Sequence, residues 1–103
     1  MAAIHWTVGA QQDLREIVEY IGRDSVVYAA SMAERLITAV ERLQQHPQLG
    51  RMVPEYKDPT LRELLVGNYR IVYRVKPTRI GVVAVAHASR ELLRKLPQAP
   101  WDL

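Results

Sequence analysis

The alternation of apolar and charged residues between Leu61 and Arg90 places the strongest constraint on the fold of this chain. Residues 69–76 alternate between the two sides of an extended strand: one side has Tyr69, Ile71, Tyr73 and Val75, and the other has Arg70, Val72, Arg74 and Lys76. This period of two is typical of a half-buried β-strand. We therefore expect one face of this strand to be apolar and the other to carry guanidinium groups.

Two further strands flank this one. Pro77 interrupts the pattern, and residues 80–86 then form an unbroken, valine-rich run that predicts a strand covered on both faces. Residues 61–66 predict a third strand, which reverses through Gly67-Asn68, a pair suited to positive φ in a tight turn. The three strands form an antiparallel meander. Arg62, Arg70 and Arg74 can share one face of it, subject to a register that the sequence does not fix.

The first half of the chain predicts a short strand and two helices. Residues 2–6 read as the strand, and Thr7 is a suitable N-cap for a helix whose apolar residues recur at helical spacing: Ala10, Leu14, Ile17, Val18 and Ile21. Gly22 favours its end, and Asp24 or Ser25 caps a second helix that ends before Pro47. The second helix has a broader stripe, made of Ala29, Met32, Ala33, Leu36, Ile37, Val40 and Leu43.

We predict a single α+β domain over residues 1–103, in the order β-α-α-β-β-β. Residues 47–59 contain three prolines and form a crossover loop, in which Arg51 is either a loop cation or a site residue. A short C-terminal helix, residues 90–96, is expected to end at Pro97. The helical hairpin should pack on one face of a mostly antiparallel, four-stranded sheet, which leaves the opposite face for function.

Composition argues against several classes of protein. The chain has no cysteine, and its histidines, His5, His46 and His87, lack the spacing of metal ligands, so we expect no metal and no cofactor. No signal peptide or apolar run long enough to span a membrane is present, which favours a cytoplasmic protein.

Residues 1–50 hold four arginines against six acidic residues, whereas residues 51–103 hold ten basic against five acidic residues. This asymmetry favours an acidic or polyanionic partner for the second half. The alternative is that the charge only keeps the outer face of the sheet soluble.

A set of residues between Trp6 and about Leu92 occurs in the order that is typical of one known family. It includes Asp13-Leu14, Tyr20-Ile21, Pro47, Gly50-Arg51, Val53-Pro54-Glu55, Arg62-Glu63-Leu64, Tyr69 to Tyr73, and Val85-Ala86-His87 followed by Arg90. This ordered set resembles the RelE/ParE superfamily of toxins from type II toxin-antitoxin modules. It implies the same fold as the patterns above. It also implies an acidic, partly disordered antitoxin as partner, which adds a strand or lays a helix in a groove.

The superfamily has two activities on this one scaffold. RelE-type members cut messenger RNA in the ribosomal A site, and ParE-type members poison DNA gyrase. Arg70 matches a strand arginine that RelE-type toxins place at the scissile phosphate, Arg90 lies near a second arginine of the family, and His87 is at a position where several members have histidine. RelE-type toxins also tend to have a lysine pair before the hairpin and a tyrosine near the C-terminus. This chain has Arg62 and Leu64 in place of the lysines and no tyrosine after Tyr73.

These departures make a ParE-like toxin that targets DNA gyrase the leading interpretation. Arginine is a permanent phosphate clamp and not a proton carrier, so RNA cleavage would need another group for proton transfer. Arg62, Arg70, Arg74, His87 and Arg90 are the candidate target-binding residues. The alternatives are a ribosome-dependent mRNA endonuclease using Arg70, His87 and Arg90, and a degenerate toxin that retains only antitoxin binding. The alternative to a functional role of His87 is that it is a structural histidine at the end of a strand.

Overall fold

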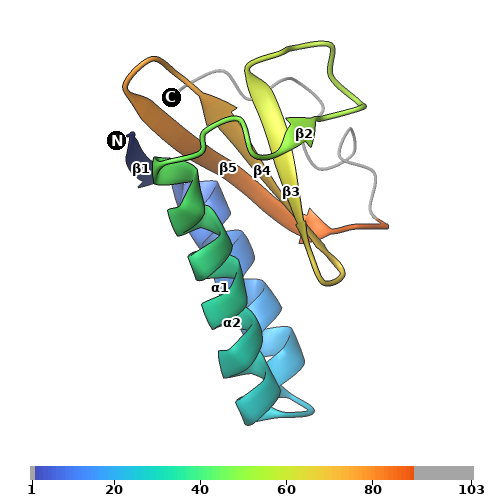
Figure 1. Cartoon of the computed structure of the whole chain (residues 1–103). Helices are drawn as coiled ribbons and strands as arrows, with labels where there is room; N and C mark the ends of the chain where they lie inside the picture. Colours follow the sequence, from blue (N-terminus) through green and yellow to red (C-terminus); the bar gives the residue numbers. More distant parts are fainter. Residues whose placement is uncertain (1, 90–103) are drawn as a thin grey trace.

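The computed structural model describes residues 2–89 of the 103-residue chain. Its elements follow in the order β1 (Ala3–Trp6), α1 (Val8–Gly22), α2 (Val26–Glu41), the 3-10 helix η1 (Arg42–Gln44), β2 (Arg51–Met52), β3 (Leu61–Val66), β4 (Tyr69–Val75) and β5 (Arg79–His87). The strands form one sheet in the order β1-β5-β4-β3-β2, against which the two helices pack as a hairpin (Figure 1). Only the β1–β5 pair is parallel among these strands. The predicted α+β fold is confirmed.

The sheet differs from the prediction in its number of strands. Within residues 2–89 it has five strands, because β2 forms within the crossover loop and pairs with Arg62 and Glu63 of β3. A strand of two residues is too short to show a period in the sequence, which explains why it was missed. The predicted C-terminal helix, residues 90–96, lies outside the described residues. No helix among residues 2–89 is long and apolar enough to cross a membrane.

The helices begin where the sequence predicts. The Thr7 hydroxyl accepts a hydrogen bond from the amide of Ala10 at 3.1 Å, and the Ser25 hydroxyl accepts one from the amide of Tyr28 at 3.0 Å. Each cap satisfies a backbone N–H group that has no partner within its own helix. These caps fix the start of each helix and therefore which faces of the hairpin meet the sheet.

One hydrophobic core lies between the hairpin and the sheet. Ile71 of β4 is fully buried there, as we expected, and its neighbours come from both layers: Ala10, Met32, Leu36, Val40, Val82 and Val85. Leu14, Ile17 and Ile21 pack against this cluster, whereas Val18 is half-buried and outside it. Tyr73 is buried beside Leu43 and Ile80 on the same face. The alternation predicted for β4 is thus confirmed.

A second core covers the opposite face of the sheet, which we had expected to be left free. It consists of Val53, Tyr56, Leu61, Val72, Val83, Ala84 and Ala86. Val53 and Tyr56 belong to the crossover loop, so this loop folds over the sheet. Val83 is an extra residue in β5, since Val72 and Tyr73 pair with Ala84 and Val82. The expectation of an open second face was wrong because the loop carries its own apolar residues.

Candidate functional site

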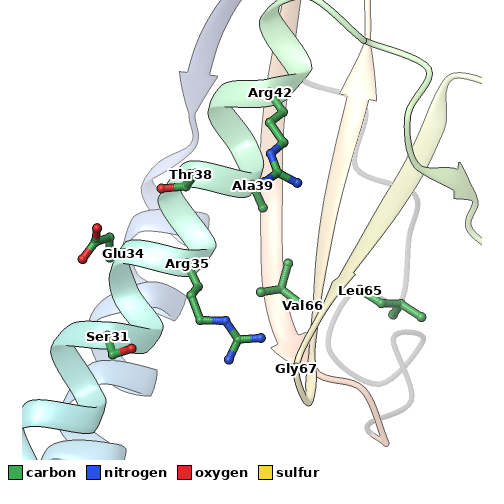
Figure 2. Close-up of a pocket in the computed structure, with 9 residues that line it drawn as sticks. All are labelled: Ser31, Glu34, Arg35, Thr38, Ala39, Arg42, Leu65, Val66 and Gly67. Carbon is green, nitrogen blue, oxygen red and sulfur yellow. The ribbon is translucent and has the colours of Figure 1, made fainter.

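A groove of about 540 Å³ lies between α2 and the end of β3 (Figure 2). Its helical side is lined by Ser31, Glu34, Arg35, Thr38, Ala39 and Arg42, and its sheet side by Leu65, Val66 and Gly67. The side chains of Arg35 and Arg42 extend toward the sheet, while that of Glu34 points away from it. Both arginines are exposed, and neither forms an ion pair within residues 2–89. Nothing in the sequence distinguishes this pair, because the two residues belong to the polar side of an ordinary amphipathic pattern.

The register of the sheet separates the arginines that we expected on one face. The turn at Gly67, where φ is +56°, pairs Val66 with Tyr69, so even-numbered positions of β3 lie beside odd-numbered positions of β4. Arg62 pairs with Tyr73 and therefore shares the face that meets the helices. Arg70 and Arg74 lie on the face covered by the crossover loop. The prediction that all three share a face is wrong.

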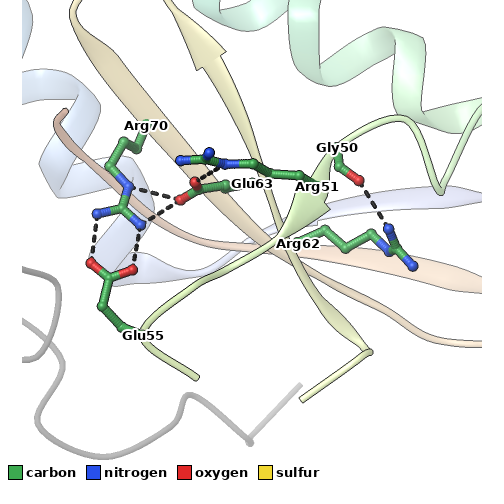
Figure 3. Close-up of polar contacts among 6 residues, drawn as sticks. All are labelled: Gly50, Arg51, Glu55, Arg62, Glu63 and Arg70. Carbon is green, nitrogen blue, oxygen red and sulfur yellow. Dashed lines mark hydrogen bonds and ion pairs between the residues drawn. The ribbon is translucent and has the colours of Figure 1, made fainter. Parts of the chain in front are cut away.

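Arg70 is buried in a network of charges (Figure 3). Its Nε donates to Glu63 Oε1 at 2.7 Å, and its Nη1 and Nη2 each donate to a carboxylate oxygen of Glu55 at 2.7 Å. Glu63, which is 1% exposed, accepts a further hydrogen bond from Nε of Arg51 at 2.7 Å. Arg51 is thus an ion-pair partner with a largely exposed side chain. Sequence reasoning missed Glu55 and Glu63 as the partners of Arg70.

The charges of this network balance, since two arginines meet two glutamates. The hydrogen bonds to Glu55 above all, followed by the interactions with Glu63, raise the pKa of Arg70 above its usual value, against the opposing effect of burial. A phosphate that approached Arg70 would have to displace carboxylates and would leave Glu63 buried with less compensation. In this arrangement Arg70 ties the crossover loop to β4.

Arg74 and Arg62 are also engaged. Nη1 of Arg74 donates to the Thr60 hydroxyl at 2.9 Å and lies 3.4 Å from Asp58 Oδ2. Hydrogen bonds from the Thr60 side chain and amide hold the pKa of Asp58 below its usual value. Nη1 of Arg62 donates to the carbonyl of Gly50 at 3.0 Å, whereas its buried Nε has no hydrogen-bond partner among the described residues. Both side chains thus contribute to anchoring the loop.

His87 lies at the end of β5 and is exposed. Its Nδ1 is 2.7 Å from the Ser89 hydroxyl, and its ring meets that of Tyr69 edge-on at a centroid distance of 5.7 Å. His87 pairs with Tyr69, whereas Arg70 pairs with Ala86, so His87 and Arg70 lie on opposite faces of the sheet. Arg90 lies outside the described residues. Within residues 2–89, no three histidine or acidic side chains are placed to hold a metal ion.

Comparison with known proteins identifies the family. Residues 4–92 match the family model of the ParE toxin of the type II toxin-antitoxin system, parDE. The chain belongs to this toxin family. Toxin RelE2 of Caulobacter vibrioides is 41% identical over 91 residues, which is 87% of this chain and 99% of that protein. The protein is thus a type II toxin of the RelE/ParE superfamily.

Solved structures share the fold of this ParE-family toxin. The chromosomal ParDE toxin-antitoxin system from P. aeruginosa gives a TM-score of 0.72 at 24% identity, over 86% of this chain and 98% of that one. The toxin-antitoxin complex RelBE2 from Mycobacterium tuberculosis gives 0.59 at 19% identity, over 84% and 96% of the two chains. RelE-type and ParE-type names therefore both occur among proteins similar to this one.

Proposed function

We propose that this toxin inhibits growth by acting on DNA gyrase and is neutralised by an acidic antitoxin. The observation that carries the proposal is the state of Arg70, whose guanidinium is saturated by Glu55 and Glu63 in a buried, charge-balanced network. The arginine that RelE-type chemistry would place at the scissile phosphate is thus occupied here. The match of residues 4–92 to the ParE toxin model supports the same assignment.

The placement of His87 gives further support. Cleavage of RNA through its 2′-hydroxyl needs a base, an acid and cations around the same phosphate. His87 and Arg70 lie on opposite faces of the sheet, so they do not form such a group around one phosphate. Inhibition of gyrase by binding requires no proton transfer. We propose that the gyrase contact lies at Arg74, whose ion pair with Asp58 is longer, at 3.4 Å, than those of Arg70, and at the segment that begins with Arg90. We assign no such contact to Arg62 and His87, which are on the helix-facing side.

An mRNA endonuclease acting in the ribosomal A site is the second candidate. It is favoured by the exposed imidazole of His87, whose Nδ1 lies 2.7 Å from the Ser89 hydroxyl. Histidine is the side chain that most often transfers protons in catalysis. In that case cleavage depends on His87, and the fixed charge of Arg74 matters less.

Induction of the toxin without its antitoxin separates the two functions. We expect DNA breaks and an SOS response, together with inhibition of supercoiling by purified gyrase. His87→Gln should leave this toxicity nearly unchanged, whereas Arg74→Ala should weaken it, with both variants compared at equal folded amounts by circular dichroism. Arrest of translation with transcripts cut in the A site, and a loss of cleavage by about two to four orders of magnitude in His87→Gln, would establish the endonuclease instead.

A further inference from the structure

We propose that the toxin contacts the phosphate backbone of duplex DNA through the end of the sheet at the turn between β4 and β5. This end lies away from the tip of the helical hairpin (Figure 1). Four cationic residues, which we call the basic end, carry the inference: Lys57, Arg74, Lys76 and Arg79. The inference rests on the proposed function, because gyrase acts on DNA, and it adds a direct contact with that DNA to the contact with the enzyme.

The register of the sheet brings these cations to one face. Lys76 follows Arg74 by two residues, so both side chains lie on the face that the crossover loop covers. The amide of Lys76 donates to the carbonyl of Arg79 at 2.9 Å, which places the two residues opposite each other across the turn and on the same face. Lys57 belongs to the loop itself and precedes Asp58, whose carboxylate lies 3.4 Å from Nη1 of Arg74. Lys57 and Arg79 are exposed, and Lys76 is partly exposed.

The basic end has little negative charge to balance it. Residues 64–89, which include β4 and β5, contain no aspartate or glutamate. Arg74 is paired with Asp58, whereas Lys57, Lys76 and Arg79 form no ion pair within residues 2–89. Like charges that face each other across two strands are destabilising, so the opposition of Lys76 and Arg79 does not serve the fold. A ligand of opposite charge gives such an arrangement a function.

Hydrogen bonds hold the basic end in place. The amide of Ala3 donates to the carbonyl of Thr78 at 3.2 Å, which ties the turn to β1. The amide of Val75 donates to the carbonyl of Thr60 at 2.8 Å, which ties the end of β4 to the segment before β3. Pro77 restricts the backbone of the turn itself. Cations on a surface held in this way require little ordering of the backbone when they bind.

The neighbours of these cations favour a phosphate backbone over an acidic protein or single-stranded bases. Protein interfaces are centred on apolar and aromatic side chains. None of the exposed large apolar side chains of the described chain belongs to residues 57–62 or 74–82. The same two ranges contain no aromatic residue on which an unpaired base could stack. Cations without such neighbours are suited to sequence-independent contact with the backbone of a duplex.

The dimensions of the sheet predict how many phosphates are contacted. Neighbouring strands are about 4.8 Å apart, and side chains two residues apart on one strand are separated by about 7 Å. The basic end therefore spans roughly 10 Å. Phosphates of one DNA strand follow each other at about 3.4 Å along the helix axis, so about three of them face these cations. Each contributes about −0.9 to the slope of log K against the logarithm of the salt concentration, which predicts a slope of about −3.

The test is fluorescence anisotropy of a labelled DNA duplex titrated with the purified full toxin at several salt concentrations. We expect a Kd of about 10⁻⁴–10⁻⁵ M at low salt. Lys76→Gln with Arg79→Gln should raise this Kd by about tenfold and reduce the slope by about 2. Arg15→Gln with Arg23→Gln is the matched control, because it removes the same charge from exposed positions of the helical hairpin. It should change the Kd by less than about twofold, with the fold of both variants checked by circular dichroism.

Two results with nucleic acid alone would overturn the inference. Equal effects of the two pairs of substitutions would show that net charge alone attracts DNA. Tighter binding of a single-stranded RNA of the same length would show that the surface serves another class of nucleic acid.

Inhibition of supercoiling by purified gyrase gives the second readout. Lys76→Gln with Arg79→Gln should weaken this inhibition in parallel with the loss of DNA affinity. Weaker inhibition with unchanged DNA affinity would place the basic end against the enzyme and not against DNA, which also overturns the inference. A parent toxin that binds DNA with the expected slope but does not inhibit gyrase would instead contradict the proposed function alone.

Discussion

At the scale of single residues, the central feature is that Arg70 serves the fold. A buried charge requires a partner, because its desolvation costs several kcal/mol in an apolar setting. Arg70 has two such partners, and each of them belongs to a different element. Glu63 lies on the adjacent strand β3, and Glu55 lies in the crossover loop. The same guanidinium therefore joins the loop to two strands.

We expect Arg70→Met to lower the free energy of unfolding by about 3–5 kcal/mol, because it removes the buried ion pair with Glu63 together with both hydrogen bonds to Glu55. Arg51→Met is the matched control. It removes the other partner of Glu63, but the Arg51 side chain is 60% exposed, so we expect a loss of about 1 kcal/mol or less. Urea unfolding measures both. Equal losses in the two variants would show that Arg70 contributes no more than a surface ion pair.

Some of these residue roles could be predicted from the sequence, and others could not. Thr7 was predicted as one cap, and Ser25 was one of two candidates, with Asp24, for the other, because these side chains precede helical patterns. The face of Arg62 follows from the two-residue turn at Gly67-Asn68, so the sequence contained the information needed to separate it from Arg70. The sequence did not predict Glu55 as a partner of Arg70. The alternation of residues along a strand assigns each side chain to a face of the sheet, but it does not identify the segment that covers that face.

At the scale of elements, the crossover loop is the part whose role the sequence predicts least. Its prolines correctly indicated an irregular connection, but its packing over the second sheet face depends on long-range contacts of Val53 and Tyr56. The buried hydroxyl of Tyr73 donates to the carbonyl of Pro47 at 3.0 Å and accepts from the amide of Gly50 at 2.8 Å. A Cβ at position 50 would lie 2.7 Å from that hydroxyl, so the close approach requires glycine.

These contacts predict a loss of stability at alkaline pH. Burial raises the pKa of Tyr73 above its ordinary value of 10.0, so the unfolded chain loses this proton first. The contribution of Tyr73 is complete below pH 10.0 and is lost as the pH rises through the folded-state pKa. Tyr56 and Tyr69 shift in the same direction, for which burial is again the main cause.

Tyr73→Phe should therefore lower stability by about 1–3 kcal/mol at pH 7, because the Gly50 amide loses its acceptor, and should reduce the decline of stability above pH 10.0. Tyr20→Phe is the control, since Tyr20 is 66% exposed. Urea unfolding between pH 7 and 11 provides the measurement. An unchanged alkaline decline in Tyr73→Phe would show that this decline has another origin.

At the scale of the whole molecule, only part of the excess basic charge of residues 51–103 is available to a partner. Residues 51–103 have ten basic and five acidic residues, but Arg51, Arg70 and Arg74 are paired with Glu63, Glu55 and Asp58. The fold thus uses much of the basic half for its own ion pairs. Meanwhile Arg35 and Arg42, in the acidic half, face the groove and form no ion pair with another residue of the range 2–89.

The salt dependence of antitoxin binding should follow these uncompensated charges and not the net charge of each half. We expect the Kd to rise by about one to two orders of magnitude between 0.1 and 0.5 M NaCl, since screening weakens exposed charge pairs. Arg35→Glu with Arg42→Glu should flatten this dependence more than Arg79→Glu with Lys57→Glu, a pair of exposed cations in the basic half. Titrations at five salt concentrations measure the slope. Each charge that contacts the partner adds to the dependence of the Kd on salt, wherever that charge lies in the sequence. A larger effect of Arg79→Glu with Lys57→Glu would therefore show that the basic half is the main docking surface.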